Sequence, residues 1–190
     1  AGNSDGSWTT DGPSVKVIPG PNIALNKTYS EGNCTSDSGL GPNKAFDGIV
    51  AKNNGWSATR TEGIGSWLQV DLQGQYFLNR IEFYDRPGDS YFGERRGFQI
   101  QVSNDPNFVE YDTLAAVGND ETIPDDSVFV ITLPGDKAYR YVRYQKTNWD
   151  YAFVSEIKIY GILVDAEKPQ WPAGSKLTAS NVSATCVTLN

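Results

Sequence analysis

Short segments with apolar side chains at every second position dominate the chain from residue 67 onward. Such a period of two predicts half-buried β-strands, because successive side chains of a strand point to opposite faces. The segments are Leu68-Val70-Leu72, Ile81-Phe83, Phe98-Ile100-Val102, Phe129-Ile131-Leu133, Val142-Tyr144 and Ile157-Ile159. No stretch shows a 3.6-residue apolar period, so helices should be short at most. Many short strands joined by turn-rich connections predict an all-β sandwich or barrel.

Four long turn-rich segments are expected to form loops, and loops of this length in a compact β domain are usually functional or flexible. They are residues 30–44, 50–66, 84–96 and 145–154. We expect Trp56 and Trp67 to lie in the core, and Phe92 and Phe153 to anchor their loops.

Composition fits one domain with tails. The 190 residues contain 38% apolar residues, 19 Gly and 10 Pro, which favours a turn-rich β fold. The net charge of −7 argues against binding driven by phosphate or anionic lipid, because both require a basic surface. Nucleic acid and membrane are therefore disfavoured as partners.

The chain divides into three parts by composition. Residues 1–20 are rich in Gly, Ser, Asp and Pro, and are expected to be a linker or the end of a preceding module. Residues 21–162 are expected to form the domain. Residues 163–190 contain a linker and then resemble the truncated first strands of a fibronectin type III domain, so we expect a fragment of a longer modular protein.

The sequence offers little for catalysis. It contains no His, which excludes Ser-His and Cys-His nucleophile arrangements, and it lacks Gly-rich phosphate loops. Asp85, Asp89 and Glu94 share one loop and could pair as in a glycosidase, but carboxylates on such a loop are usually solvated. Cys34 and Cys186 are the only cysteines and show no zinc spacing; two unpaired thiols are favoured over a disulfide. We expect no enzymatic activity within this chain.

Two distant segments have the composition of one calcium site. Asp47 and the permissive Gly48 lie in a loop that offers free backbone carbonyls, and Glu156 could close the cage from far along the chain. The alternative is an ordinary turn in which Asp47 accepts hydrogen bonds from its own backbone. The paired Glu156 favours calcium. Because an all-protein cage leaves no open position, the ion would be structural.

Residues 22–162 resemble a discoidin-like domain, the fold of coagulation-factor C-type domains and family 32 carbohydrate-binding modules. The motifs that carry the resemblance are Asn22-Ile23-Ala24-Leu25-Asn26-Lys27, Lys44-Ala45-Phe46-Asp47-Gly48, Trp56, Trp67-Leu68-Gln69-Val70-Asp71-Leu72, Gly97-Phe98-Gln99-Ile100-Gln101-Val102-Ser103-Asn104-Asp105, Tyr139-Arg140-Tyr141-Val142-Arg143 and Ser155-Glu156-Ile157-Lys158-Ile159-Tyr160-Gly161. The resemblance implies an eight-stranded antiparallel jelly-roll β-sandwich, a structural calcium ion and a ligand site in loops at one end.

The resemblance also implies the calcium ligands. They are the Lys44, Ile49 and Ser155 carbonyls, the Asp47 and Glu156 carboxylates, and Asn54. Asn54 stands where the family usually has Thr, and Ile49 where it usually has a polar residue. Neither departure removes an oxygen ligand, since Asn offers both a carbonyl and a side-chain oxygen.

Sugar recognition needs an aromatic face together with planar charged groups that bond neighbouring hydroxyls. Loops 86–96 and 147–153 supply both, and the resemblance implies that they lie near each other at the calcium end. The predicted sugar-binding residues are Trp149 or Tyr151 as the platform, Arg86, Asp89 and Arg95 as hydrogen-bonding groups, Tyr91 as a flank and Glu31 as a further acceptor. Arg96 is expected to pair with a carboxylate.

The resemblance and the residues together predict a non-catalytic carbohydrate-binding module of a secreted bacterial enzyme that acts on polysaccharide. Galactose-binding members often carry a His just after the Trp that matches Trp56, where this chain has Ser57-Ala58, so a plain galactose specificity is weakened. Neutral or amine-bearing glycans suit the acidic chain better than polyanionic ones. The alternatives are an adhesion or protein-binding discoidin domain and a lipid-binding C-type domain.

Overall fold

The computed structural model describes residues 20–58, 65–88, 91–124 and 127–164. Most of the predicted linker 1–20 and of the predicted fibronectin-like segment 163–190 lies outside these residues. The described elements are β1 (Thr28–Gly32), η1 (Pro42–Ala45), β2 (Trp56–Ala58), β3 (Trp67–Tyr84), β4 (Phe98–Ser103), β5 (Asp112–Val117), β6 (Val128–Thr132), β7 (Ala138–Lys146), β8 (Ala152–Val154) and β9 (Glu156–Leu163). None of the described helices could cross a membrane, since η1 is a single 3₁₀ turn.

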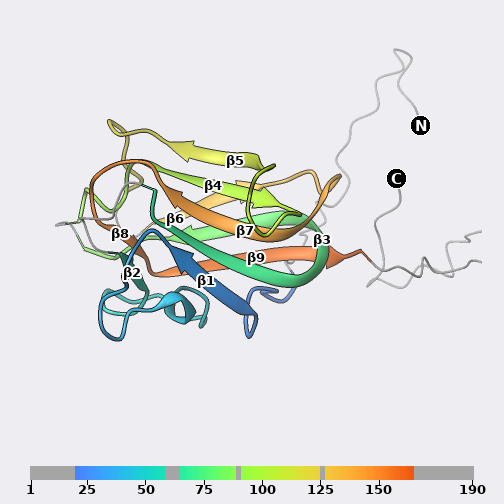
Figure 1. Ribbon diagram of the computed structural model, residues 1–190, viewed down its shortest axis with the longest axis horizontal. Helices are drawn as coiled ribbons and strands as arrows, with labels where there is room; N and C mark the ends of the chain where they lie inside the picture. Colours follow the sequence, from blue (N-terminus) through green and yellow to red (C-terminus); the bar gives the residue numbers. More distant parts are fainter. Residues whose placement is uncertain (1–19, 59–64, 89–90, 125–126, 165–190) are drawn as a thin grey trace, which may run out of the picture.

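The predicted all-β antiparallel sandwich is confirmed (Figure 1). One layer has the strand order β1-β3-β7-β4-β5, and β6 and β9 pair with the second half of β3. A separate pair, β2 and β8, lies at the end of the molecule that carries the long loops. The described residues hold nine strands where the resemblance implied eight.

Strand β3 runs through both layers and organises the fold. The sequence pattern predicted two strands here, near residues 67–72 and 80–84, but the structure has one strand of 18 residues. Register shifts between Asp71 and Tyr76 and between Leu78 and Arg80 let the strand bend while its ladders continue. Gln73, with a φ of 63°, lies within the first irregularity. The bend therefore replaces the turn that the polar interruption suggested.

The burial of side chains in the structure confirms the predicted alternation. Leu68, Val70 and Leu72 are all fully buried, as are their counterparts on β4 and β9. A cluster of aromatic rings fills the centre of the core: the Phe83 and Tyr144 ring centroids are 5.6 Å apart, and Phe98 lies 5.3 Å from Tyr144. Such contacts add to the stabilisation from apolar burial. The core fixes the strand ends from which the functional loops emerge.

Two short strands and two of the four aromatic side chains singled out in the sequence differ from the predictions. Strands β2 and β8 have three residues each, all buried, so they show no alternation to detect. Trp56 lies in the core as predicted, whereas Trp67 is only half-buried and has the Arg143 guanidinium 4.3 Å from its ring centroid. Phe153 is buried and anchors its loop, but the same prediction for Phe92 was wrong, because its side chain is exposed.

A surface ion pair lies at the end of the sandwich away from the long loops. Arg140 Nε and Nη2 each donate to an oxygen of the Asp71 carboxylate at 2.8 Å, and these hydrogen bonds lower the pKa of Asp71. Because the folded pKa is depressed, the stabilisation is present above the ordinary Asp pKa of about 3.9 and is lost as pH falls below it. We expect Asp71→Asn to lower the free energy of unfolding by about 0.5–1 kcal/mol at pH 7, since solvent screens the pair. Urea titrations should show this difference vanishing near pH 2; a pH-independent difference would contradict the assignment.

Candidate functional site

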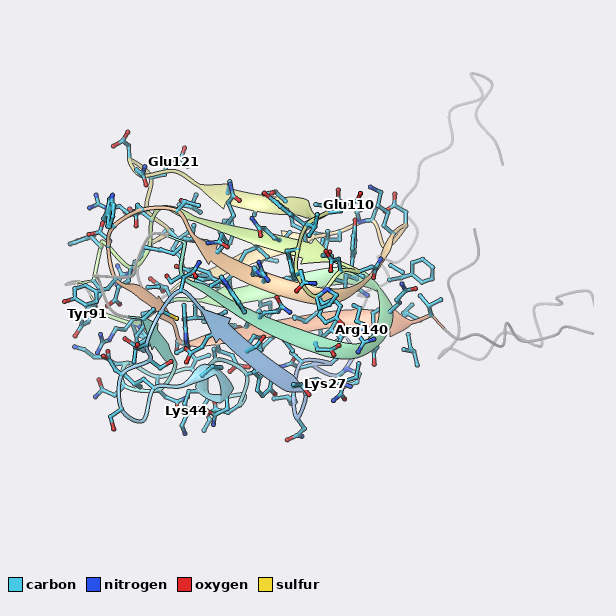
Figure 2. All side chains as sticks on the ribbon, viewed as in Figure 1. Lys27, Lys44, Tyr91, Glu110, Glu121 and Arg140 are labelled. Atoms are coloured by element: carbon cyan, nitrogen blue, oxygen red, sulfur yellow. The ribbon has the colours of Figure 1, made fainter. Side chains whose placement is uncertain are left out.

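The predicted calcium loop and the predicted sugar-binding loops lie at the same end of the sandwich. Figure 2 shows Lys44 and Tyr91 at this end, with Arg140 near the opposite one. We call residues 44–54 the metal loop, residues 91–97 the ligand arm and residues 147–151 the aromatic loop. The metal loop begins within the last two residues of η1, the ligand arm precedes β4, and the aromatic loop joins β7 to β8.

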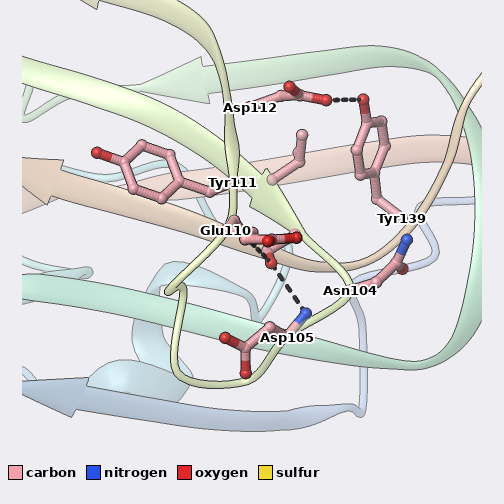
Figure 3. Close-up of a pocket in the computed structure, with 8 residues that line it drawn as sticks. Asn104, Asp105, Glu110, Tyr111, Asp112 and Tyr139 are labelled. Carbon is pink, nitrogen blue, oxygen red and sulfur yellow. Dashed lines mark hydrogen bonds between the residues drawn. The ribbon is translucent and has the colours of Figure 1, made fainter.

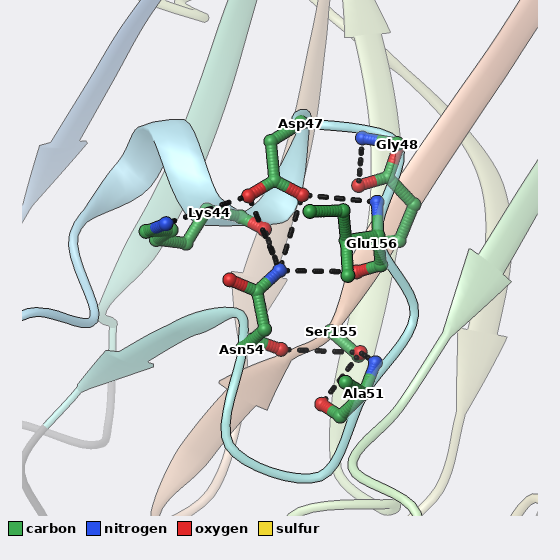
Figure 4. Close-up of polar contacts among 8 residues, drawn as sticks. Lys44, Asp47, Gly48, Ala51, Asn54, Ser155 and Glu156 are labelled. Atoms are coloured by element: carbon green, nitrogen blue, oxygen red, sulfur yellow. Dashed lines mark hydrogen bonds and ion pairs between the residues drawn. The ribbon is translucent and has the colours of Figure 1, made fainter.

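Local packing directs the Asp47 side chain away from the core and toward the centre of the metal loop. Phe46 is buried and its ring stacks on that of Tyr29, with centroids 4.7 Å apart. Gly48 has a φ of 85°, which favours glycine and reverses the chain. The Ile49 N–H donates to Asp47 Oδ1 at 2.9 Å, so the ordinary Asp turn considered from the sequence is also present. The turn leaves both carboxylate oxygens of Asp47 facing the centre of the loop (Figure 4).

Four oxygens converge on the side-chain amide of Asn54 (Figure 4). Its nitrogen lies 3.1 and 3.2 Å from the two Asp47 carboxylate oxygens, 3.1 Å from the Ile49 carbonyl and 3.4 Å from the Lys44 carbonyl. An amide nitrogen has only two hydrogens to donate. The loop therefore gathers more acceptors than this donor can satisfy, as expected where a hard cation takes oxygen ligands.

Glu156 closes the loop from β9. Its Oε2 accepts the Gly48 N–H at 3.1 Å, while its buried Oε1 has no hydrogen-bond partner. Burial is the main cause that raises the pKa of Glu156 to about 8, and the nearby Asp47 carboxylate raises it further. A bound cation would supply the partner that the buried carboxylate lacks.

Ser155 contributes a contact that the sequence did not predict. Its hydroxyl oxygen lies 3.2 Å from both the Ala51 and the Asn54 carbonyls, which share its single hydrogen, and it accepts the Ala51 N–H. These bonds hold the far side of the metal loop against β8 and β9. Within the described ranges no three His, Cys, Asp or Glu side chains cluster as metal ligands, so backbone carbonyls would have to supplement the two carboxylates. With that supplement, the Asp47 and Glu156 carboxylates and the Lys44 and Ile49 carbonyls offer the kind of oxygen ligands that a calcium ion takes.

The aromatic loop presents two large side chains to solvent. Trp149 is 67% exposed and Tyr151 is 49% exposed. Between them, Asp150 accepts two hydrogen bonds from the Arg96 guanidinium, at 2.9 and 3.1 Å, which confirms the expected pairing of Arg96 with a carboxylate. The loop therefore displays its aromatic rings from a backbone that is fixed to the ligand arm.

Buried Lys146 supports the ligand arm from below. Its ammonium donates to the Gly93 carbonyl at 2.9 Å and to the Arg96 carbonyl at 2.7 Å, and burial lowers its pKa to about 8. A Cβ on Gly93 would lie 2.9 Å from the Asp150 side chain, so glycine permits the close approach of arm and loop. Sequence reasoning missed Lys146, because its position at the end of an alternating strand suggested only an ordinary polar residue.

Replacing Lys146 tests this support. We expect Lys146→Met to lower the free energy of unfolding by about 1–2 kcal/mol, because two carbonyls lose their donor while the apolar stem is kept. Lys137→Met is the matched control: that ammonium is exposed and pairs with Asp112 at 3.3 Å, so the change should be near zero. Chemical denaturation at pH 7 measures both. Equal effects of the two substitutions would contradict the supporting role.

Arg86 and Tyr91 lie beside the metal loop. The Arg86 guanidinium carbon is 4.2 Å from the Tyr91 ring centroid and 4.6 Å from that of Phe153. Its Nε donates to the Lys52 carbonyl at 3.0 Å, and its Nη1 lies 3.4 Å from Glu94. Most of the side chain is therefore engaged within the protein, although the sequence predicted that it bonds sugar.

Two other predicted sugar-binding residues are engaged in contacts within the protein. Arg95 is 1% exposed and its guanidinium pairs with buried Asp85, so a direct sugar contact is not available to it. Glu31 accepts hydrogen bonds from Trp56 Nε1 and Ser36, and thereby orients a core tryptophan. Pairing of this kind leaves no signal in the local sequence pattern. The remaining predicted residue, Asp89, lies outside the described residues.

A groove of about 400 Å³ (Figure 3) is lined by residues that include Glu110, which lies away from the loop end in Figure 2. Its acidic side chains are largely engaged: Asp105 accepts the N–H groups of Asn107 and Val109, and Asp112 accepts from Tyr139 at 2.6 Å. Among the residues that the structure describes, none of those predicted to bind sugar or calcium lines the groove. We therefore retain the loop end as the candidate site.

The comparisons with known proteins agree with this architecture. The model of the F5/8 type C domain matches residues 26–157, and no curated protein matches the chain. The lectin domain of lectinolysin in complex with Lewis B antigen is similar, with a TM-score of 0.62, 18% identity, and 76% of this chain and 99% of that chain covered. A fucose-binding module of Streptococcus pneumoniae has a TM-score of 0.59 at 18% identity, covering 73% and 96%.

A third similar structure is chitosan-binding module 1 from a chitosanase/glucanase of Paenibacillus sp. IK-5. Its TM-score is 0.55 at 24% identity, with 74% of this chain and 98% of that chain covered. At these identities the structures establish the fold alone. The family model spans well over half of the chain, from β1 to the start of β9. The protein therefore belongs to the F5/8 type C, or discoidin-like, domain family.

Proposed function

We propose that this domain is a non-catalytic carbohydrate-binding module, of the family 32 type, that targets a larger secreted bacterial enzyme to a polysaccharide or glycan. The observation that carries the proposal is the aromatic loop, where Trp149 and Tyr151 face solvent from a backbone held by the Arg96–Asp150 pair. Sugar rings stack on such surfaces through their apolar faces, and a prepositioned ring reduces the entropic cost of binding. The similar structures that are lectins or sugar-binding modules support this proposal.

The charges near the aromatic loop are balanced in pairs. Arg96 pairs with Asp150, and Arg86 lies near Glu94. This local compensation, together with the net charge of −7, supports neutral or amine-bearing sugar units over polyanionic glycans. We expect dissociation constants from the millimolar to the tens-of-micromolar range, about −4 to −7 kcal/mol.

A structural calcium ion in the metal loop forms part of the proposal. The convergence of four oxygens on Asn54 and the unpartnered Oε1 of Glu156 support it. Lys44, Asp47, Ile49, Asn54, Ser155 and Glu156 would hold the ion. When bound, calcium would supply charge compensation and order, and the residues beside it include no base for a reaction.

The carboxylates considered as a glycosidase pair support a non-catalytic function. Asp85 pairs with Arg95 in the interior, and Glu94 is buried beside Arg86. Two carboxylates flanking a scissile bond would have to face a substrate cleft. Both carboxylates are buried instead, Asp85 against Arg95 and Glu94 of the ligand arm against Arg86.

One observation favours the second candidate, a protein- or lipid-binding discoidin domain. Phe92 is 59% exposed beside the aromatic loop, as an insertion into lipid or a protein groove would require. Cosedimentation with phosphatidylserine vesicles tests the lipid alternative. Sedimentation with vesicles and no retention by any glycan would favour it.

Affinity electrophoresis in gels containing polysaccharides tests the proposed function. The panel should include neutral polymers such as galactan and xylan, amine-bearing chitosan, and polyanionic alginate. We expect retardation in at least one neutral or amine-bearing gel. If no polymer retards the domain in the presence of calcium, the proposed function is wrong.

A further inference from the structure

Arg86 contacts three segments that are far apart in the sequence. Its Nε donates to the Lys52 carbonyl of the metal loop at 3.0 Å, and its Nη1 lies 3.4 Å from Glu94 of the ligand arm. The planar guanidinium lies between the rings of Tyr91 and Phe153, with centroid distances of 4.2 and 4.6 Å. A planar group with several donors can make all these contacts at once, which an ammonium cannot.

The contact on the metal loop lies between two proposed calcium ligands. Lys52 is three residues after Ile49 and two before Asn54. A cation coordinated by the Ile49 and Asn54 oxygens would fix the position of the short segment between these residues, including the Lys52 carbonyl. The Lys52 ammonium also lies 5.5 Å from the Tyr91 ring centroid, so metal loop and ligand arm meet at a second point.

Further contacts connect the part of the ligand arm that Arg86 touches with the aromatic loop. The Glu94 N–H donates to the Tyr91 carbonyl at 3.1 Å, which folds the arm into a turn around the Arg86 side chain. Two residues further, Arg96 binds Asp150 between the exposed aromatic rings. A continuous series of contacts therefore runs from the metal loop through Arg86 to the proposed sugar platform.

We propose that Arg86 is a positioning residue that couples calcium binding to the order of the ligand arm and to glycan affinity. This inference rests on the proposed function and deepens it by assigning a regulation of the same site. Coupling is reciprocal, so calcium should tighten glycan binding by the same factor by which glycan tightens calcium binding. Typical coupling energies correspond to factors of about 5 to 150.

Hydrogen exchange with calcium chloride alone tests the coupling without any glycan. In the wild-type domain, calcium should slow exchange of the ligand-arm amides, including those of Glu94 and Arg95, by at least about fivefold. In Arg86→Met, calcium should protect the metal loop but not the arm. Arg86→Lys should behave like Arg86→Met, because the ammonium cannot keep every contact. Arg140→Lys, at the other end of the molecule, is the matched control and should behave like wild type.

The possible outcomes separate this inference from the proposals on which it rests. Calcium protection of the metal loop without protection of the arm in wild type overturns the coupling alone, as does equal arm protection in wild type and Arg86→Met. Failure of calcium to bind at all, measured by calorimetry, overturns both the coupling and the calcium site. Glycan retention in the electrophoresis is a separate readout, so failure of the carbohydrate proposal remains distinguishable.

Discussion

Replacing Trp149 with alanine is expected to weaken glycan binding at least about tenfold, equivalent to about 1.4 kcal/mol or more. Trp149 is 67% exposed in the absence of any ligand, so the substitution removes a binding surface without leaving a cavity in the core. The free energy of unfolding should therefore change by less than about 0.5 kcal/mol. Affinity electrophoresis and calorimetry measure the binding loss, and urea denaturation confirms that the fold is retained.

Tyr111→Ala is the matched control for Trp149→Ala. Tyr111 is another exposed aromatic residue, but it lines the groove away from the loop end. Its removal should leave glycan affinity within about twofold of wild type, a change of about 0.4 kcal/mol. Normal binding by Trp149→Ala together with loss of binding by Tyr111→Ala would move the sugar site to the groove.

Removal of calcium is expected to lower the melting temperature of the domain by about 5–10 °C. A ligand at about 100 times its dissociation constant stabilises the folded state by about 2.7 kcal/mol, and each kcal/mol shifts the melting temperature of a domain of this size by about 2–4 °C. The effect arises because the ion would neutralise the buried Glu156 carboxylate and satisfy the oxygens around Asn54. Scanning calorimetry in excess calcium and in excess chelator measures the shift.

Glu156→Gln separates loss of the ion from other effects of the chelator. The amide keeps the shape of the side chain but removes its charge, so the variant should melt at the same temperature with and without calcium. Asp112→Asn, in the groove away from the loop end, should retain the full calcium shift. An unchanged wild-type melting curve in excess chelator would count against a bound ion.

The sequence predicted those parts of the fold that depend on alternating burial. Leu68, Val70 and Leu72 face the core because alternate side chains of a strand point to the same face. The same rule could not detect β2 and β8, whose residues are all buried, nor the bend that continues β3 through its polar interruption. Both depend on contacts between segments distant in the sequence.

The candidate site was predicted less completely than the fold. Trp149 and Tyr151 are exposed as a sugar platform requires, because a tryptophan between Asn148 and Asp150 has no periodic place in the core. Arg95 looked equally suitable in the sequence but is buried against Asp85. The local pattern shows where a charged residue occurs along the chain, but the partner that draws it inward is known only from the folded structure.

The most direct test of carbohydrate binding at the loop end is nuclear magnetic resonance of the ¹⁵N-labelled domain. A soluble oligosaccharide of a polymer that retards the domain in electrophoresis is titrated in the presence of calcium. We expect the largest shift changes at the Trp149 indole N–H and at the amides of the ligand arm and aromatic loop. Shifts confined to the groove around Tyr111, or no shifts at all, would contradict a sugar site at the loop end.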